Sequence, residues 1–176
     1  TSNAPLHPYN GNLIFKTQYA CVQDLEWTFR FKQRLIVLPN LKIKNGSPYP
    51  KIQVGIKTAL PLNANWASFV FSRITLWHSF NLNRFGSLQC RAETGGFLNS
   101  NHTGIMDYKH FFGNLTLFQN LPLEGFRNTP YYQYSTVNPY LQWHAELHLK
   151  GFLLNNIAFL NTLNIQEVIG THGLFI

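Results

Sequence analysis

The sequence predicts an all-β fold, an antiparallel β-barrel of the outer-membrane type, and three observations support this prediction. Apolar and polar residues alternate without a break from Leu141 to Lys150, which is the period of a β-strand. Charged residues make up only 12% of the chain and aromatic residues 15%, a balance that fits a membrane barrel or an adhesive secreted β-protein. Long connections also alternate with short ones, as in outer-membrane barrels.

The length and hydropathy limit the architecture further. The chain has 176 residues, enough for one domain, and we interpret residues 1–176 as a single β-barrel segment. No apolar run approaches the roughly 20 residues of a spanning helix, so any insertion into a membrane has to be by strands. The alternative is a soluble secreted β-sandwich or small barrel that binds an apolar ligand.

Strands are predicted from alternation between turn signals. In chain order they are Asn12–Tyr19, Leu25–Leu38, Lys51–Leu60, Trp66–Asn83, Ser87–Leu98, Asn138–Phe152 and Ile165–Ile176. The alternation slips near Arg73, which predicts a bulge there. The tight turn at 83–86 predicts a hairpin between its flanking strands, whereas 99–138 has little periodicity and is expected to be a long connection.

A short amphipathic helical connector is expected between the last two strands. Leu153, Ile157 and Leu160 fall at i, i+4 and i+7, which places them on one helical face. The strand that follows has no turn after it. A bare sheet edge is costly in lipid, so we expect a partial barrel whose last edge is paired by further chain, by another subunit or by the first strand.

Alternation assigns the two faces of the predicted barrel. The apolar set Leu141–Leu149 is expected to face lipid, and the intervening polar side chains are expected to face the lumen. Three cations of the Leu25–Leu38 segment are expected to join them, because three charges on one strand face are costly against lipid. The predicted lumen-facing set is Arg30, Lys32, Arg34, Gln142, His144, Glu146, His148 and Lys150.

Two groups within this set could bind a ligand. His144, Glu146 and His148 lie on one strand face, and histidines two residues apart could share a zinc ion; the alternative, which we favour, is a polar stripe in which Glu146 pairs with a cation on a neighbouring strand. The basic stripe of Arg30, Lys32 and Arg34 could form a path for anions or acidic ligands. The favoured alternative is a wet face balanced by Glu93 and Glu146.

Aromatic residues and cysteines have two interpretations each. Trp66, Trp77 and the tyrosines at 131, 132 and 134 are either interfacial anchors or ordinary core and loop residues. Cys21 and Cys90 lack metal-ligand spacing; a buried free thiol at Cys90 is favoured over a disulfide.

The sequence predicts neither an enzyme nor a cofactor. It lacks a Gly-x-Ser-x-Gly elbow and a phosphate-binding glycine loop, and its seven acidic residues are scattered. Lys and Arg exceed Asp and Glu by seven, but no run of cations is longer than two, so nucleic acid is not expected as a partner. The expected partners are outer-membrane lipid and other outer-membrane or periplasmic proteins.

Three blocks resemble a known family. The first block is Gly46-Ser47 with Tyr49-Pro50. The second is residues 84–88, followed by Glu93 and residues 96–98. The third is residues 151–168, which end in Gln166-Glu167-Val168. In this order they are similar to outer-membrane proteins of uncharacterised function that join a carboxypeptidase-regulatory-like β-sandwich to a barrel related to the surface-antigen barrels of assembly factors. The resemblance implies a bacterial outer-membrane location, a barrel fold, and a structural, transport or assembly role.

Overall fold

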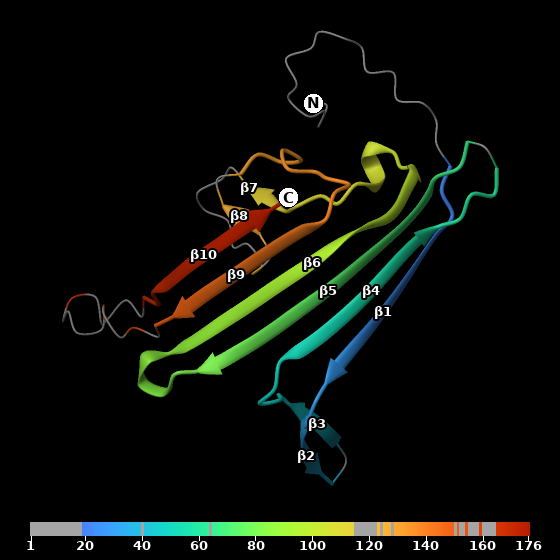
Figure 1. The fold of residues 1–176 in the computed structure, drawn as a ribbon. Coiled ribbons are helices and arrows are strands. Elements are labelled where there is room, and N and C mark those ends of the chain that lie inside the picture. The colour runs from blue at the N-terminus through green and yellow to red at the C-terminus, as the bar shows by residue number, and fades with distance from the viewer. Residues whose placement is uncertain are drawn as a thin grey trace.

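In a computed structural model, six antiparallel strands form one open, curved sheet in the order β1-β4-β5-β6-β9-β10 (Figure 1). The strands are β1 Val22–Arg30, β4 Lys51–Ala59, β5 Ser68–Asn81, β6 Ser87–His102, β9 Tyr140–His148 and β10 Val168–Phe175. The structure describes residues 19–39, 41–63, 65–114, 123, 125–127, 129–149, 151, 154, 159 and 165–176. Over this part of the chain the all-β prediction is confirmed, and no helix there is long and apolar enough to cross a bilayer.

Two small sheets and two 3₁₀ turns complete the described elements. Below the large sheet, β2 (Arg34–Leu38) and β3 (Leu41–Asn45) form a hairpin (Figure 1). The connection between β6 and β9 holds β7 (Gly113–Asn114), β8 (Phe126–Arg127) and η2 (Ile105–Asp107). The turn η1 (Asn83–Phe85) joins β5 to β6. It ends at Gly86, whose φ of 100° favours glycine, so the predicted hairpin is confirmed.

The prediction of one strand over Leu25–Leu38 is wrong. The ladder between β1 and β4 ends at the pair Arg30 and Lys51, beyond which β1 has no further partner in the large sheet. The chain turns at Lys32, whose φ is +45°, and β2 then pairs with β3 instead. Alternation continued through this region, but pairing decided where the strand ended.

The predicted bulge near Arg73 is also misplaced. The register shifts lie between Ser68 and Phe71, and Arg73 pairs regularly with Gly55 and Gly95. The apparent slip arises because Phe69 and Phe71 lie on the polar face, where they join a local core. A change of environment along one strand therefore looked like a change of register.

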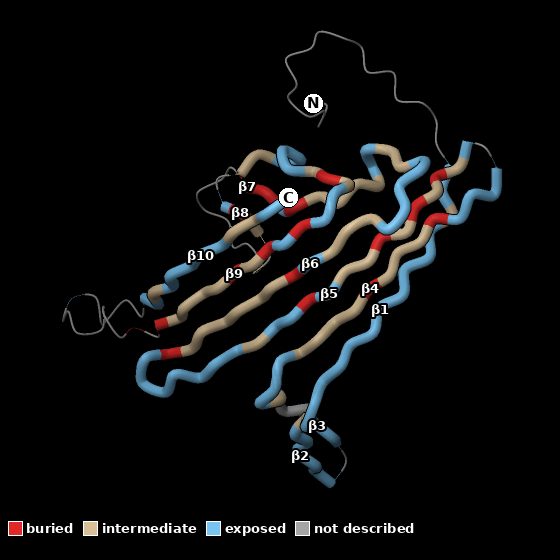
Figure 2. The backbone as a smooth tube through the Cα atoms, viewed as in Figure 1, coloured by how far each residue is buried: buried red, intermediate tan, exposed pale blue. Residues whose placement is uncertain are grey.

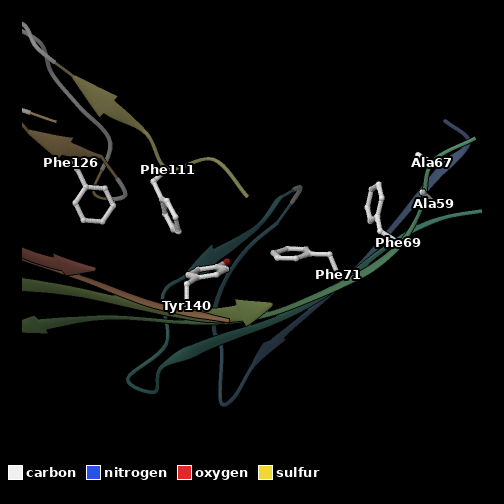
Figure 3. Packing of buried hydrophobic residues seen from close by; sticks show 7 residues of the cluster. All are labelled: Ala59, Ala67, Phe69, Phe71, Phe111, Phe126 and Tyr140. Carbon is white, nitrogen blue, oxygen red and sulfur yellow. The ribbon is translucent and has the colours of Figure 1, made fainter. Parts of the chain in front are cut away.

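The local core lies at one end of the polar face. It consists of Ala59, Ala67, Phe69, Phe71, Phe111, Phe126 and Tyr140. Figure 3 shows Phe111 standing over Tyr140 of the sheet, with Phe126 beside Phe111 and Phe71 beside Tyr140. The ring of Tyr140 stacks on Phe71 at a centroid separation of 6.4 Å and meets Phe111 edge to face at 5.1 Å, which are favourable distances for aromatic pairs.

The last predicted strand is confirmed over Val168–Phe175. Of the three partners expected for its free edge, the first strand is not the one observed: among the described strands, β10 pairs only with β9, and β1 and β10 lie at opposite edges of the sheet. Over the described residues the sheet is thus open and does not close into a barrel. The predicted strand Asn12–Tyr19 (apart from Tyr19 itself), Lys150 and most of the predicted connector Leu153–Leu163 lie outside the described residues.

Candidate functional site

The two faces of the sheet differ in chemistry and in exposure. Cross-strand register places most of the apolar residues of the six strands on one face, which we call the apolar face. Its large exposed side chains are Leu25, Trp27, Phe29, Ile74, Leu76, Phe80, Leu141, Ile169 and Phe175. Cys90 also lies there, opposite Ala145. An exposed apolar face of this extent is unusual for a soluble monomer.

The polar face is the more buried of the two. Its fully buried residues include Thr75, Glu93, Gln142 and His144, and Figure 2 shows buried positions along β5, β6 and β9 whereas β1 is exposed throughout. The described residues between β6 and β9, which are 103–114, 123, 125–127 and 129–139, contact this face through Lys109, Phe111 and Phe126; we call them the cover segment. Gln142, His144, Glu146 and His148 lie together on this face, opposite the apolar residues of β9.

Glu93 is the centre of the polar face. Its side chain is only 1% exposed. One carboxylate oxygen, Oε1, accepts hydrogen bonds from Lys109 Nζ at 2.7 Å and Tyr140 Oη at 2.6 Å. The other, Oε2, accepts from Arg91 at 2.9 Å and Thr75 Oγ1 at 3.2 Å. A buried carboxylate needs such partners, and here they link β5, β6 and β9 to the cover segment.

Backbone and side-chain contacts around Lys109 join the two ends of the cover segment to each other. The backbone amides of Lys109 and Thr136 each donate to the other's carbonyl at 3.0 Å. His110 Nδ1 lies 2.7 Å from Ser135 Oγ, and its ring meets Tyr132 edge to face at 5.0 Å. Burial, together with the nearby charge of Lys109, lowers the pKa of His110 below its ordinary value of 6.5, because desolvation disfavours the imidazolium.

A basic row crosses the sheet next to Glu93. Successive cross-strand partners on the polar face are Arg30, Lys51, Trp77, Arg91, His144 and His172, one from each strand. Like charges directly opposite one another, as Arg30 and Lys51 are, destabilise a sheet. We call this set the basic row.

The basic row borders an open cleft of about 500 Å³. The row contributes one wall, and the segments that flank the β2–β3 hairpin contribute the other. Its lining consists of Arg30, Gln33, Gly46, Ser47, Tyr49, Lys51, Gln53, Trp77, His78, Ser79 and Arg91. None of these described lining residues is acidic, so the cleft is cationic and of a size that suits a small molecule.

The structure separates the three residues considered for zinc. His148 Nε2 lies 3.4 Å from Glu146 Oε2, whereas His144 packs between Phe126 and His172, at ring separations of 4.7 and 6.1 Å. Among the described residues, no group of three or more His, Cys, Asp or Glu side chains is arranged to hold a metal ion. Glu146 also meets Arg127 of β8 at 4.0 Å, so its cation comes from the cover segment and not from a neighbouring strand of the sheet.

The predicted basic stripe is divided among three elements. Arg30 lies on β1, Lys32 in the turn with its Nζ 5.4 Å from the ring of Tyr49, and Arg34 on β2. Glu93 does not balance this stripe, because its carboxylate is taken by Arg91 and Lys109. The prediction grouped Arg30 with the wrong cations: its neighbour across the sheet is Lys51.

Other expectations are resolved by position. Trp77 lies on the polar face, which excludes it from an anchor belt on the apolar face. Leu149, expected to face outward, is past the end of β9 and buried, with its amide donating to the carbonyl of Glu167. Cys21 and Cys90 are free, as expected, but Cys90 is half-buried instead of buried.

Two features of the site were not predicted from the sequence: the role of Lys109, and the row that contains Arg30, Lys51 and Arg91. The alternation of Arg91 and Glu93 on one strand face was a usable signal for their ion pair, since residues two apart share a face. Lys109 had no such signal because it lies in a connection without periodicity. The row depends on register across strands that are distant in sequence.

The fold and the site define the class of protein: an all-β chain with an open antiparallel sheet, one exposed apolar face, and a polar face under its own cover segment. Neither a curated protein nor a solved structure matches the chain. The chain belongs to the family described as "Family of unknown function (DUF5686) C-terminal domain", whose model matches residues 1–176.

Proposed function

We propose that this chain is part of an outer-membrane β-barrel with a structural, transport or assembly role and no catalytic activity of its own. The observation that carries the proposal is the exposed apolar face, which extends across all six strands. In a soluble β-sandwich this face would be the core, and the polar face would meet water. Here the chain's own cover segment lies on the polar face instead.

The size of the apolar face supports lipid as its partner. Aromatic side chains bury about 150–250 Å² each. Trp27, Phe29, Phe80 and Phe175 are between 46% and 64% exposed, so they present roughly 400 Å² between them. The exposed Leu and Ile side chains of the same face add to this area. The total exceeds the few hundred Å² of contiguous apolar surface that soluble monomers usually expose. Contact with hydrocarbon removes the free-energy cost that such a face has in water.

The edges of the sheet bear on how the barrel would be completed. In lipid, every backbone N–H and C=O needs a partner, so β1 and β10 would each pair with a further strand, from this protein or from another. The resemblance of the 46–50, 84–98 and 151–168 blocks to barrels coupled to a carboxypeptidase-regulatory-like domain is consistent with a larger bacterial outer-membrane protein.

A matched pair of cysteine variants tests the proposal. Trp27 and Thr28 are adjacent on β1 and both are exposed, but they lie on opposite faces. In a background with Cys21→Ser and Cys90→Ser, membranes carrying Thr28→Cys should react with a membrane-impermeant maleimide. Trp27→Cys should react only after detergent dissolves the bilayer. Equal labelling of both in intact membranes, or a protein that stays monomeric in buffer without detergent, would favour the soluble alternative.

A further inference from the structure

We infer that the cleft at the hairpin end of the polar face binds a small polyanion through phosphate or carboxylate groups held by Arg30 and Lys51. This inference needs only the sheet and the hairpin, and it stands whether or not the apolar face meets lipid. It rests on uncompensated charge, on a built wall and on the chemistry of the lining.

The charges of Arg30 and Lys51 are not compensated within the described residues. The two side chains are direct cross-strand partners, yet no carboxylate of the described part forms an ion pair with either of them. Glu26, the acid nearest along β1, pairs with Arg73 at 2.7 Å and accepts from Gln53 Nε2 at 2.7 Å. A pair of like charges on a sheet is unfavourable, and an anion bound between them would relieve the repulsion.

The opposite wall of the cleft is fixed by local hydrogen bonds. Ser47 Oγ donates to the carbonyl of Phe31 and accepts from the amide of Tyr49 at 3.1 Å. These bonds tie the β3–β4 connection to the turn after β1, so that Tyr49 and Gly46 face the basic row across the cleft. The wall is thus set by the backbone and not by mobile side chains alone.

The remaining lining suits an anion with a flat body. Trp77 lies between Lys51 and Arg91 in the basic row, where its ring could stack on a sugar or a planar group. Gln33, Gln53 and Ser79 supply neutral hydrogen-bonding groups around the cations. Arg91 is already bonded to Glu93, so Arg30 and Lys51 are the groups that carry the ligand's charge.

Binding of sodium pyrophosphate and of sodium citrate to the full chain in detergent micelles tests this inference, by calorimetry at about 0.15 M salt, where distant charges are screened. A hydrogen bond to a charged group contributes enough that each lost cation should weaken binding about tenfold. Arg30→Gln with Lys51→Gln should therefore raise Kd about 100-fold. Lys51→Arg should retain binding, and Lys42→Gln, which removes an exposed cation of β3 outside the cleft, should change it less than about twofold.

The source of the anion is separated by a second measurement. If pyrophosphate or citrate binds, the ligand class is a soluble polyanion. If only vesicles containing phosphatidylglycerol bind, with the same dependence on Arg30 and Lys51, the oxyanion belongs to a lipid headgroup. The inference is overturned if none of the three probes binds, or if Lys42→Gln weakens binding as much as Lys51→Gln. Each single variant gives the same comparison should the double variant fail to fold.

Discussion

Replacing Glu93 by Gln should release the cover segment from the sheet. The substitution keeps the shape of the side chain but removes the charge that meets Lys109 at 2.7 Å and Arg91 at 2.9 Å. The two cations are then left in a largely buried site, with side chains 18% and 19% exposed. Removing one partner of a buried ion pair costs about 3–5 kcal/mol.

The lower end of that range is the better expectation here. Both cations retain some access to water. The amide oxygen of the substituted side chain could still accept the hydrogen bond that Tyr140 Oη donates to Glu93. We therefore expect a loss of about 3 kcal/mol, concentrated in the docking of the cover segment. If that docking opens and closes as a unit, this loss corresponds to a roughly hundredfold rise in its open population.

Hydrogen exchange at two amides tests this expectation. The amides of Lys109 and Thr136 donate to each other's carbonyls within the cover segment, next to the ion pair of Lys109 with Glu93, so their protection reports whether the segment keeps its structure around that ion pair. Both should exchange about 100-fold faster in Glu93→Gln. The matched control is Glu146→Gln, on the same face but paired with Arg127 at 4.0 Å, whose side chain is 60% exposed; such a pair contributes at most about 1 kcal/mol. Unchanged protection in Glu93→Gln, or an equal effect of both variants, would refute the role of Glu93.

Two other properties of the structure can be tested in the same way. A Cβ at Gly173 would collide with Nε1 of Trp143 across the β9–β10 ladder, so Gly173→Val should lower the free energy of unfolding in urea by about 1–3 kcal/mol. Gly170→Val on the same strand should lower it much less, because a Cβ there would be 3.7 Å from its nearest neighbour. Equal losses in the two variants would exclude the contact with Trp143. The lowered pKa of His110 means that the undocked segment binds a proton more readily than the docked one, so protection of the Lys109 amide should be full above the ordinary pKa of 6.5 and should fall as pH drops below it. His110→Gln should remove that pH dependence, and a pH profile unchanged by this substitution would show that another group is responsible.

The sequence was sufficient for most of the strands and for the two faces of β9, but not for where each strand ends or for which strands pair beyond the β5–β6 hairpin. Alternation is a local property, and it correctly separated Trp143 from His144 on β9 and placed the β5–β6 hairpin around its turn. It could not end β1 at Arg30, because that end is set by where β4 begins. It also misread Phe69 and Phe71, whose place on the polar face depends on Phe111 from a segment without periodicity.

The candidate site shows the same division between local and cross-strand information. His144, Glu146 and His148 share a face, as predicted, but what each one meets is decided by other segments: Phe126 and Arg127 come from β8. The composition gave seven more cations than acids, without saying where the surplus lies. Only the register across β1 and β4 brings Arg30 beside Lys51.

The distribution of acids over the polar face explains why the surplus gathers at the hairpin end. Asp24 lies opposite Lys57 at the far end of β1. Glu26 is used by Arg73, Glu93 by Arg91 and Lys109, and Glu146 by His148 and Arg127. Each of these acids thus has a cation nearer to it than Arg30 or Lys51. Since the hairpin wall adds Gln33, Ser47 and Tyr49 but no carboxylate, the charges of Arg30 and Lys51 are left facing the cleft, which is where an anion from outside the chain would complete the balance.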